Sequence, residues 1–154
     1  MLKVFIACPY SQYKKSIYCE QLAASAQLAS ALILRNVAVY SPATHNHSIY
    51  DASQPEDHVS STMHENLRLQ SLSFHSWADA LFVIDFPETT SSGNIQEDIT
   101  LFREAEKPVR FIDPSNIQSN LDTLLEELTQ CDSPRLKHND KEKPYARPHH
   151  HRTY

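Results

Sequence analysis

The sequence predicts an α/β protein of the Rossmann-like, doubly wound class, with a parallel sheet of four to five strands and helices on both faces. Short apolar runs alternate along the chain with longer segments whose apolar residues recur at helical spacing. The short runs are almost continuously apolar, as in strands buried on both faces of a parallel sheet. Strands that alternate with helices are joined by right-handed crossovers, which places helices on both faces.

Four short apolar runs are the predicted strands. They span residues 2–7, 37–40, 80–84 and 109–112. The second run ends before Ser41-Pro42, where the proline ring removes a donor from the strand ladder.

Four longer segments carry apolar residues at the spacing of one helix face. They span residues 18–34, 67–77, 95–107 and 117–128. The polar stretch 43–61 is expected to be a long loop with one helical turn at most, and residues 85–92 a turn-rich loop. Loops as long as the first are uncommon without a functional reason.

The chain of 154 residues is long enough for one core, so we expect one domain over residues 1–130. Beyond it the apolar periodicity is lost, and residues 131–154 are expected to be a polar tail with little structure of its own. We exclude the histidine run 149–151 of this tail from the site.

The overall composition excludes several classes of partner. The formal net charge of −5 argues against nucleic-acid polymers, because their binders use a basic face to release counterions. No apolar run approaches the roughly 20 residues of a membrane-spanning helix, so no membrane partner is expected. Three cysteines without a CxxC pair, and a strand-like N-terminus in place of a signal peptide, predict a cytoplasmic setting.

Polar segments follow three of the predicted strands at their carboxyl ends. They are residues 8–11, 41–47 and 85–97. Ligands of open parallel sheets bind at this edge, near the point where the strand order reverses. We therefore expect the three segments to form one pocket.

Residues 91–97 have the pattern of a helix start. Serine side chains can cap free amide groups, and Gly93, the only glycine, stands where the backbone must bend or approach a ligand. A helix N-terminus favours anions. Glu97 lies one turn further on, so its carboxylate is a candidate nucleophile or base. The same residues also fit an ordinary helix cap, so the motif does not decide the function by itself.

Three segments together carry a family resemblance. Residues 5–11 read Phe-Ile-Ala-Cys-Pro-Tyr-Ser, residues 40–42 read Tyr-Ser-Pro ahead of His45 and His47, and residues 91–97 read Ser-Ser-Gly-Asn-Ile-Gln-Glu. This combination resembles the nucleoside 2-deoxyribosyltransferase superfamily, above all its bacterial and phage branch. The likeness covers roughly residues 1–115. It implies cleavage or transfer of the N-glycosidic bond of a 2-deoxynucleoside or its 5′-monophosphate.

The resemblance implies that a carboxylate of the third segment is the nucleophile. In the family a Ser or Asp, any residue, Gly, three residues and Glu mark it, which here falls on Ser91, Gly93 and Glu97. Asp98 is the alternative if Asn94 takes the glycine position in a left-handed conformation. We prefer Glu97, because the pattern requires Gly. Asp98, about 100° further around the helix, is then expected to face away from the pocket.

The resemblance also implies partners for the nucleophile. Tyr10 matches a family aromatic hydroxyl that binds near the nucleophile or the sugar, and we expect it in the catalytic site. A second family Asp, which handles the proton of the departing base, lies on the helix before the third strand. The corresponding residues 70–72 are Gln, Ser and Leu. His75 or Glu65 could replace it, or the substrate or the activity could differ.

The remaining candidates are expected to bind the substrate. Asp85 suits a ribose hydroxyl, although a strand-end Asp also forms turns. Cys8 is expected to be a small packed residue and not a nucleophile. His45 and His47 suit a phosphate or a sugar hydroxyl and lack a third ligand for zinc, so no metal is expected. The full expected set of binding residues is Cys8, Pro9, Ser11, His45, His47, Asp85, Ser91 and Gly93.

The implied reaction needs no cofactor. The carboxylate attacks the anomeric carbon and expels the base, leaving a glycosyl-enzyme ester that a second base or water resolves. The sequence leaves transfer and hydrolysis open. Family members often complete the pocket from a neighbouring subunit, so a homo-oligomer is expected. The alternative, which the missing Asp favours, is a non-catalytic Rossmann-like module that binds a nucleotide or a nucleotide-derived signal.

Overall fold

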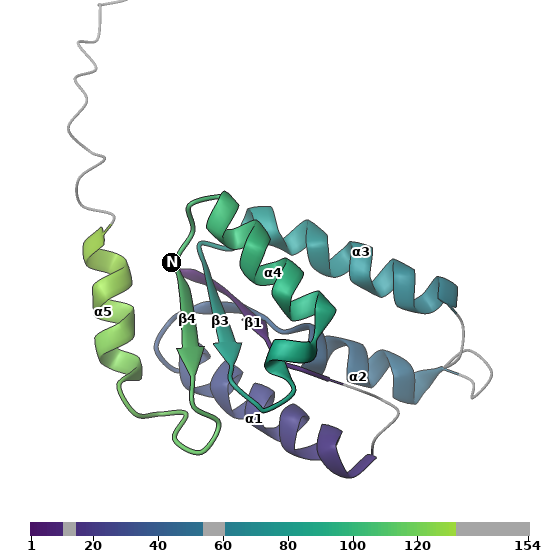
Figure 1. Ribbon diagram of the computed structural model, residues 1–154. Coiled ribbons are helices and arrows are strands. Elements are labelled where there is room, and N and C mark those ends of the chain that lie inside the picture. Colours follow the sequence, from purple (N-terminus) through teal and green to yellow (C-terminus); the bar gives the residue numbers. More distant parts are fainter. Residues whose placement is uncertain (11–14, 54–60, 132–154) are drawn as a thin grey trace, which may run out of the picture.

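The computed structural model describes residues 1–10, 15–53 and 61–131 (Figure 1). Its elements in chain order are β1 (Lys3–Ala7), α1 (Lys15–Ile33), β2 (Ala38–Tyr40), α2 (Pro42–Ala52), α3 (Ser61–Trp77), β3 (Ala80–Ile84), the 3-10 turn η2 (Thr89–Ser91), α4 (Gly93–Glu104), β4 (Val109–Ile112) and α5 (Leu121–Cys131). The predicted binding residue Ser11 and residues 132–154 of the expected tail lie outside the described residues.

The four strands form one parallel sheet in the order β2-β1-β3-β4, which confirms the predicted fold class. Phe5 of β1 pairs with Tyr40 on one side and with Leu81 on the other. The chain passes from β1 outward to β2, then returns through α2 and α3 to β3 on the far side of β1. The strand order therefore reverses between β1 and β3, where ligands of open parallel sheets bind.

Each face of the sheet has its own apolar layer, as Figure 1 shows for the helices. On one face, Val4 and Ile6 of β1 pack with apolar residues of α1 and α5. On the other, Phe5 and Ala7 pack with residues of α3 and α4, among them Phe102. All five residues of β3 are buried, as expected for a central strand between two helical layers.

The expectation of a long loop over residues 43–61 is wrong, because α2 spans Pro42–Ala52. Ser41 caps this helix by accepting a hydrogen bond from the Thr44 amide at 3.4 Å, and Pro42 occupies the first turn, where a missing N–H costs nothing. Only two residues of α2, Ala43 and Tyr50, are buried. Because its apolar face is so narrow, the sequence of α2 shows little apolar periodicity.

Other boundaries differ from expectation at the helix ends. The helix expected over 67–77 begins at Ser61, and the last helix begins at Leu121 and not at residue 117. Asn120, which precedes the last helix, has a φ of 61°, a left-handed conformation that asparagine tolerates better than most residues. Apolar spacing misplaced the start of α3 because its first turn is largely polar. It misplaced the start of α5 because an apolar residue, Ile117, lies in the turn ahead of that helix.

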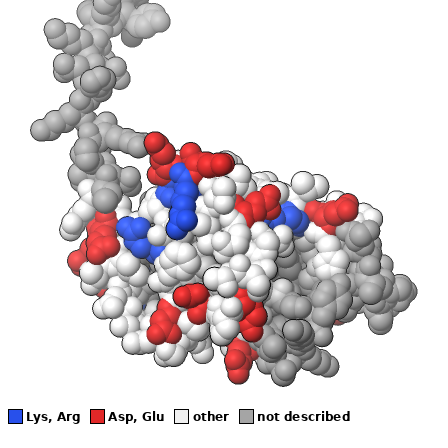
Figure 2. Space-filling model, viewed as in Figure 1, with Lys and Arg blue, Asp and Glu red and all other residues white. Residues whose placement is uncertain are grey.

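The surface carries interspersed charges. On the face seen in Figure 2, the Lys and Arg side chains occur in small groups beside Asp and Glu, without a continuous basic patch. No helix in residues 1–10, 15–53 or 61–131 is both long and apolar enough to cross a membrane.

Truncating the core phenylalanine of α4 should destabilise the fold strongly. Phe102 is 1% exposed, so Phe102→Ala should lower the free energy of unfolding by about 3–5 kcal/mol in urea titrations. Phe111 on the edge strand β4 is 50% exposed and is the matched control, with an expected loss of less than about 1 kcal/mol. Equal losses would contradict the assignment of the two layers.

Candidate functional site

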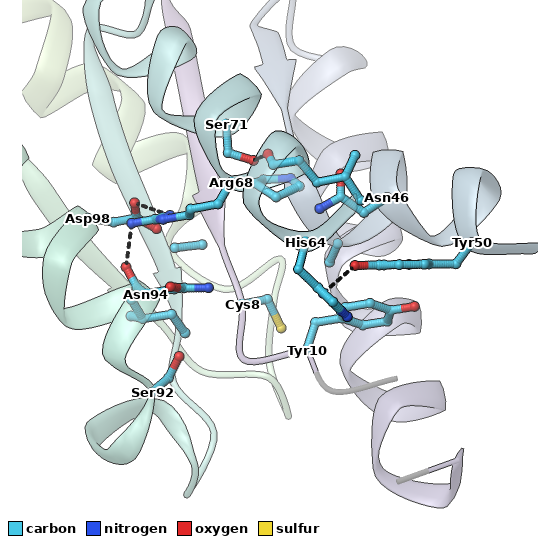
Figure 3. Close-up of a pocket in the computed structure, with 15 residues that line it drawn as sticks. Cys8, Tyr10, Asn46, Tyr50, His64, Arg68, Ser71, Ser92, Asn94 and Asp98 are labelled. Atoms are coloured by element: carbon cyan, nitrogen blue, oxygen red, sulfur yellow. Dashed lines mark hydrogen bonds and ion pairs between the residues drawn. The ribbon is translucent and has the colours of Figure 1, made fainter. Parts of the chain in front are cut away.

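A cavity of about 260 Å³ lies at the carboxyl ends of β1 and β3 (Figure 3). Its wall comes from the chain after β1 and from α2, α3 and α4, which agrees with the position expected where the strand order reverses. The volume is slightly below the 300–1,000 Å³ typical of drug-sized ligands, so the cavity suits a small ligand better than a dinucleotide. Its polar lining residues are Cys8, Tyr10, Asn46, Tyr50, His64, Arg68, Ser71, Ser92, Asn94 and Asp98.

One face of α3 supplies much of the polar wall. His64, Arg68 and Ser71 line the cavity at spacings of four and three residues, and His75 continues the same stripe beyond it. Residues at these spacings share one helix face. The spacing of these polar residues is visible in the sequence. The helix was predicted from the apolar residues between them, so the polar stripe was not recognised.

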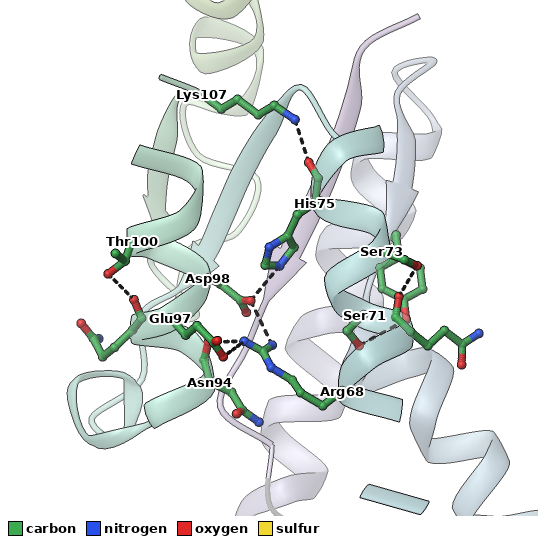
Figure 4. Close-up of polar contacts among 12 residues, drawn as sticks. Arg68, Ser71, Ser73, His75, Asn94, Glu97, Asp98, Thr100 and Lys107 are labelled. Carbon is green, nitrogen blue, oxygen red and sulfur yellow. Dashed lines mark hydrogen bonds and ion pairs between the residues drawn. The ribbon is translucent and has the colours of Figure 1, made fainter. Parts of the chain in front are cut away.

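Asp98 is a carboxylate buried in the cavity wall. Only 3% of the residue is exposed. Arg68 Nη1 donates a hydrogen bond to Asp98 Oδ1 at 3.0 Å, and His75 Nε2 lies 2.8 Å from the same oxygen (Figure 4). The His75 contact is a close approach without hydrogen-bond alignment, because Nε2 finds no partner at a suitable angle. The His75 ring is held edge-on between Phe5 and Phe102.

Glu97 lies at the edge of this cluster and does not line the cavity. Its side chain is 52% exposed, and its Oε2 accepts a hydrogen bond from Arg68 Nη2 at 2.5 Å. The expectation that Glu97 faces the pocket and Asp98 faces away is therefore wrong. The buried residues of α4 are Ile95, Asp98, Ile99 and Phe102, which form one helical stripe. The apolar members of that stripe, visible in the sequence, put position 98 on the inward face.

α3 carries no carboxylate at residues 70–72, the position that the family resemblance implies for the second acid. Ser71 occupies that part of the wall, where its hydroxyl donates to Leu67 O at 3.0 Å and lies 3.4 Å from the Tyr40 hydroxyl. Of the two suggested substitutes, Glu65 is exposed and outside the wall, and His75 contacts Asp98.

Two tyrosine and histidine pairs lie on the side of the cavity toward α2. The Tyr10 hydroxyl lies 3.1 Å from His47 Nδ1, and His47 Nε2 lies 3.1 Å from an Asp51 carboxylate oxygen. The Tyr50 hydroxyl lies 2.8 Å from His64 Nδ1. The structure thus brings together two predicted site residues, Tyr10 and His47, although only the first lines the cavity. Tyr50 and His64 were missed, because both fall in or beside the presumed loop.

With His47, six of the described predicted binding residues lie outside the cavity wall, which is a correction to the expected site. His45 is on the exposed side of α2 with its ring 5.7 Å from that of Tyr40, and Asp85 is exposed. The Ser91 hydroxyl donates to Glu88 O, as part of η2. Pro9 is buried elsewhere, and Gly93 is exposed.

The expected backbone roles of Gly93 and the serine cap are also wrong. Gly93 has no positive φ, and a Cβ added there would meet nothing within 4 Å. Ser92 is the N-cap residue of α4 but makes no side-chain capping bond. A side chain at position 93 is therefore sterically tolerated, and the single glycine does not mark a tight turn in this structure.

Cys8 is a packed thiol in the cavity wall. Burial raises its pKa to about 12, the charge of Glu88 adds to the rise, and a hydrogen bond with Ser25 opposes it. The thiol donates to Gln21 O at 3.6 Å. Because the thiolate is the nucleophilic form, Cys8 is unsuited to nucleophilic catalysis near neutral pH, in line with its expected packing role.

The described residues include no group of three or more His, Cys, Asp or Glu side chains placed to hold a metal ion. Neither a protein-family model nor a curated protein sequence matches this chain. The chemical groups of the cavity wall include a carboxylate, a guanidinium, an imidazole and two phenols, from Asp98, Arg68, His64, Tyr10 and Tyr50.

Cys8 should react far more slowly with iodoacetamide at pH 8 than the exposed Cys19. With a pKa of about 12, about one Cys8 thiol in 10⁴ is ionised at that pH, and burial further limits access. Peptide mass mapping over time should give rates that differ by at least about 100-fold. Comparable rates would show that Cys8 is ionised or accessible.

Removing the buried carboxylate should destabilise the protein more than removing its neighbour. Asp98→Ala leaves Arg68 and His75 without their shared partner and should cost about 3 kcal/mol of unfolding free energy. Glu97→Ala removes a half-exposed ion pair and should cost less than about 1 kcal/mol. Urea unfolding of both variants tests this order, and the reverse order would contradict the burial of Asp98.

Proposed function

We propose that this protein cleaves or transfers the N-glycosidic bond of a 2-deoxynucleoside or its 5′-monophosphate, with a carboxylate of α4 as the nucleophile. The observation that carries the proposal is the buried Asp98 carboxylate in the wall of the cavity. The cavity lies where the strand order of a doubly wound sheet reverses, the usual ligand position of such folds. The resemblance of residues 91–97 to the family motif supports a carboxylate nucleophile on α4, although the motif falls on Glu97 and the cavity is lined by its neighbour Asp98.

Asp98 is the better placed of the two acids. Both of its close contacts, to Arg68 and to His75, involve Oδ1. Among the described residues, Oδ2 accepts no hydrogen bond, so this oxygen is available to attack a carbon atom. The Arg68 guanidinium holds Oδ1 in place, and an ionised carboxylate can act as a nucleophile.

The remaining groups of the cluster suit a supporting role. Glu97 Oε2 and Asn94 O both accept hydrogen bonds from Arg68 Nη2, which fixes the guanidinium against α4. The guanidinium in turn sets the orientation of Asp98. Preorganised contacts of this kind lower the cost of reaching the transition state, because the groups need not reorganise during the reaction.

The reaction would proceed through a glycosyl-enzyme ester. Asp98 Oδ2 bonds to C1′ as the bond from C1′ to the base nitrogen breaks, and the developing positive charge lies next to a carboxylate. Water or a second base then displaces the carboxylate and restores it. These two acceptors give hydrolysis and transfer respectively.

A non-catalytic nucleotide-binding module is the second candidate. It is favoured by one observation, that Glu97 and Asp98 are both paired with Arg68 and α3 offers no carboxylate to the cavity. On this proposal the cavity binds the nucleotide and releases no base.

Asp98→Asn should abolish base release, whereas Glu97→Gln should change it by less than about tenfold, or about 1.4 kcal/mol of barrier. Asparagine keeps the shape of Asp98 but is a poor nucleophile and cannot stabilise the positive sugar. The measurement is chromatography of free base after incubation with a panel of deoxynucleosides and their 5′-monophosphates, with circular dichroism to confirm folding.

If Glu97→Gln loses base release while Asp98→Asn retains it, the nucleophile is Glu97 and not Asp98. If the wild-type protein binds a nucleotide by calorimetry yet releases no base from any compound, the binding module replaces the enzyme.

A further inference from the structure

We propose that His64 is the general acid that protonates the departing base, the role for which the sequence offers no carboxylate on α3. This inference rests on the proposed glycosidic reaction. A base that leaves from C1′ carries the electron pair of the broken bond, so a proton donor beside it accelerates the step. His64 is positioned for this on the wall of the cavity that faces Asp98.

The placement of His64 follows from α3. It stands one turn before Arg68 on the cavity side of the helix, at the end nearer α2. In Figure 3, Asp98 lies on the α4 side of the cavity, whereas His64 lies on the α3 side, next to Tyr50. A nucleophile and an acid on different walls leave room between them for a sugar, with the base toward the acid.

Tyr50 fixes the His64 ring. The tyrosine is buried on α2, and its hydroxyl oxygen lies 2.8 Å from His64 Nδ1, with the ring centroids 5.6 Å apart. When the imidazole is protonated, Nδ1–H donates to this hydroxyl, and the proton on Nε2 is the one to transfer. An acid or base oriented by a third group is the usual arrangement of such sites.

The other proton donors near the cavity have different tasks in this structure. His75 contacts Asp98, and Ser71 donates to the Leu67 carbonyl. The Tyr10 hydroxyl is paired with His47 on α2. Glu65 neighbours His64 in sequence but is exposed and outside the wall. Of the described residues that line the cavity, His64 is therefore the best placed acid.

The step balances in atoms and charge. Asp98 Oδ2 forms a bond to C1′, the bond between C1′ and the base nitrogen breaks, and the base nitrogen takes the proton from His64 Nε2. In the second step the neutral imidazole accepts a proton from water as the water oxygen bonds to C1′. The bond between C1′ and Asp98 Oδ2 breaks as the water oxygen bonds, which restores the Asp98 carboxylate and the protonated His64.

The test compares a base that needs a proton with one that does not. His64→Gln should release adenine from 2′-deoxyadenosine, or the best natural base of the panel, at least about 100-fold more slowly than wild type. It should release 7-methylguanine from 7-methyl-2′-deoxyguanosine within about fivefold of wild type, after subtraction of the enzyme-free rate, because that base leaves without protonation. Tyr50→Phe should show the same selectivity with a smaller loss.

Two further measurements keep the result unambiguous. Added imidazole should restore part of the lost activity to His64→Ala, which a purely structural role would not allow. His45→Gln is the matched control, because His45 lies on the exposed side of α2 outside the cavity, and its rates should equal those of wild type.

Equal losses on the natural and methylated substrates, or a failure of imidazole to restore His64→Ala, would overturn the role of His64 while leaving the glycosidic reaction in place. No base release by the wild-type protein from any of these substrates would overturn the proposed function itself, and the role of His64 with it.

Discussion

The interaction on which the site depends is the bridge from Arg68 on α3 to the neighbouring acids Glu97 and Asp98 of α4. The two helices cover the same face of the sheet, and the guanidinium joins them at the point where the cavity opens. A buried carboxylate is costly unless it is paired, so Asp98 can remain in the wall only while this contact is present. The packing of α3 against α4 and the position of the buried acid are therefore linked.

The sequence alone predicts the strands of the sheet but does not predict α2. Continuous apolar runs identify β1 and β3, because burial on both faces permits little else. In α2 only Ala43 and Tyr50 are buried, so its helical character resides in the Ser41 cap and in Pro42, signals that a search for apolar spacing passes over. A helix that lines a cavity can carry polar residues there, and because these residues interrupt the apolar periodicity, the segment is easily mistaken for a loop.

The sequence likewise predicts only part of the candidate site. The sequence placed it at the strand ends, and Tyr10 and Cys8 do line the cavity there. The orientation of α4 was misjudged, because a motif gives spacing along the chain, whereas the inward face of a helix is decided by the residues that pack on the sheet. His64 on α3 could not be inferred from strand ends, because it comes from a crossover helix that reaches over the cavity.

The contacts of Asp98 make its two oxygens chemically unequal. In the ester that the proposed reaction would form on Oδ2, Oδ1 would be the carbonyl oxygen, and the Arg68 guanidinium donates to that atom. The guanidinium would draw electron density toward that carbonyl as the sugar departs, and so make the carboxylate a better leaving group in the second half of the proposed reaction. One cationic side chain would thus restrain the acid before attack and assist its release afterwards.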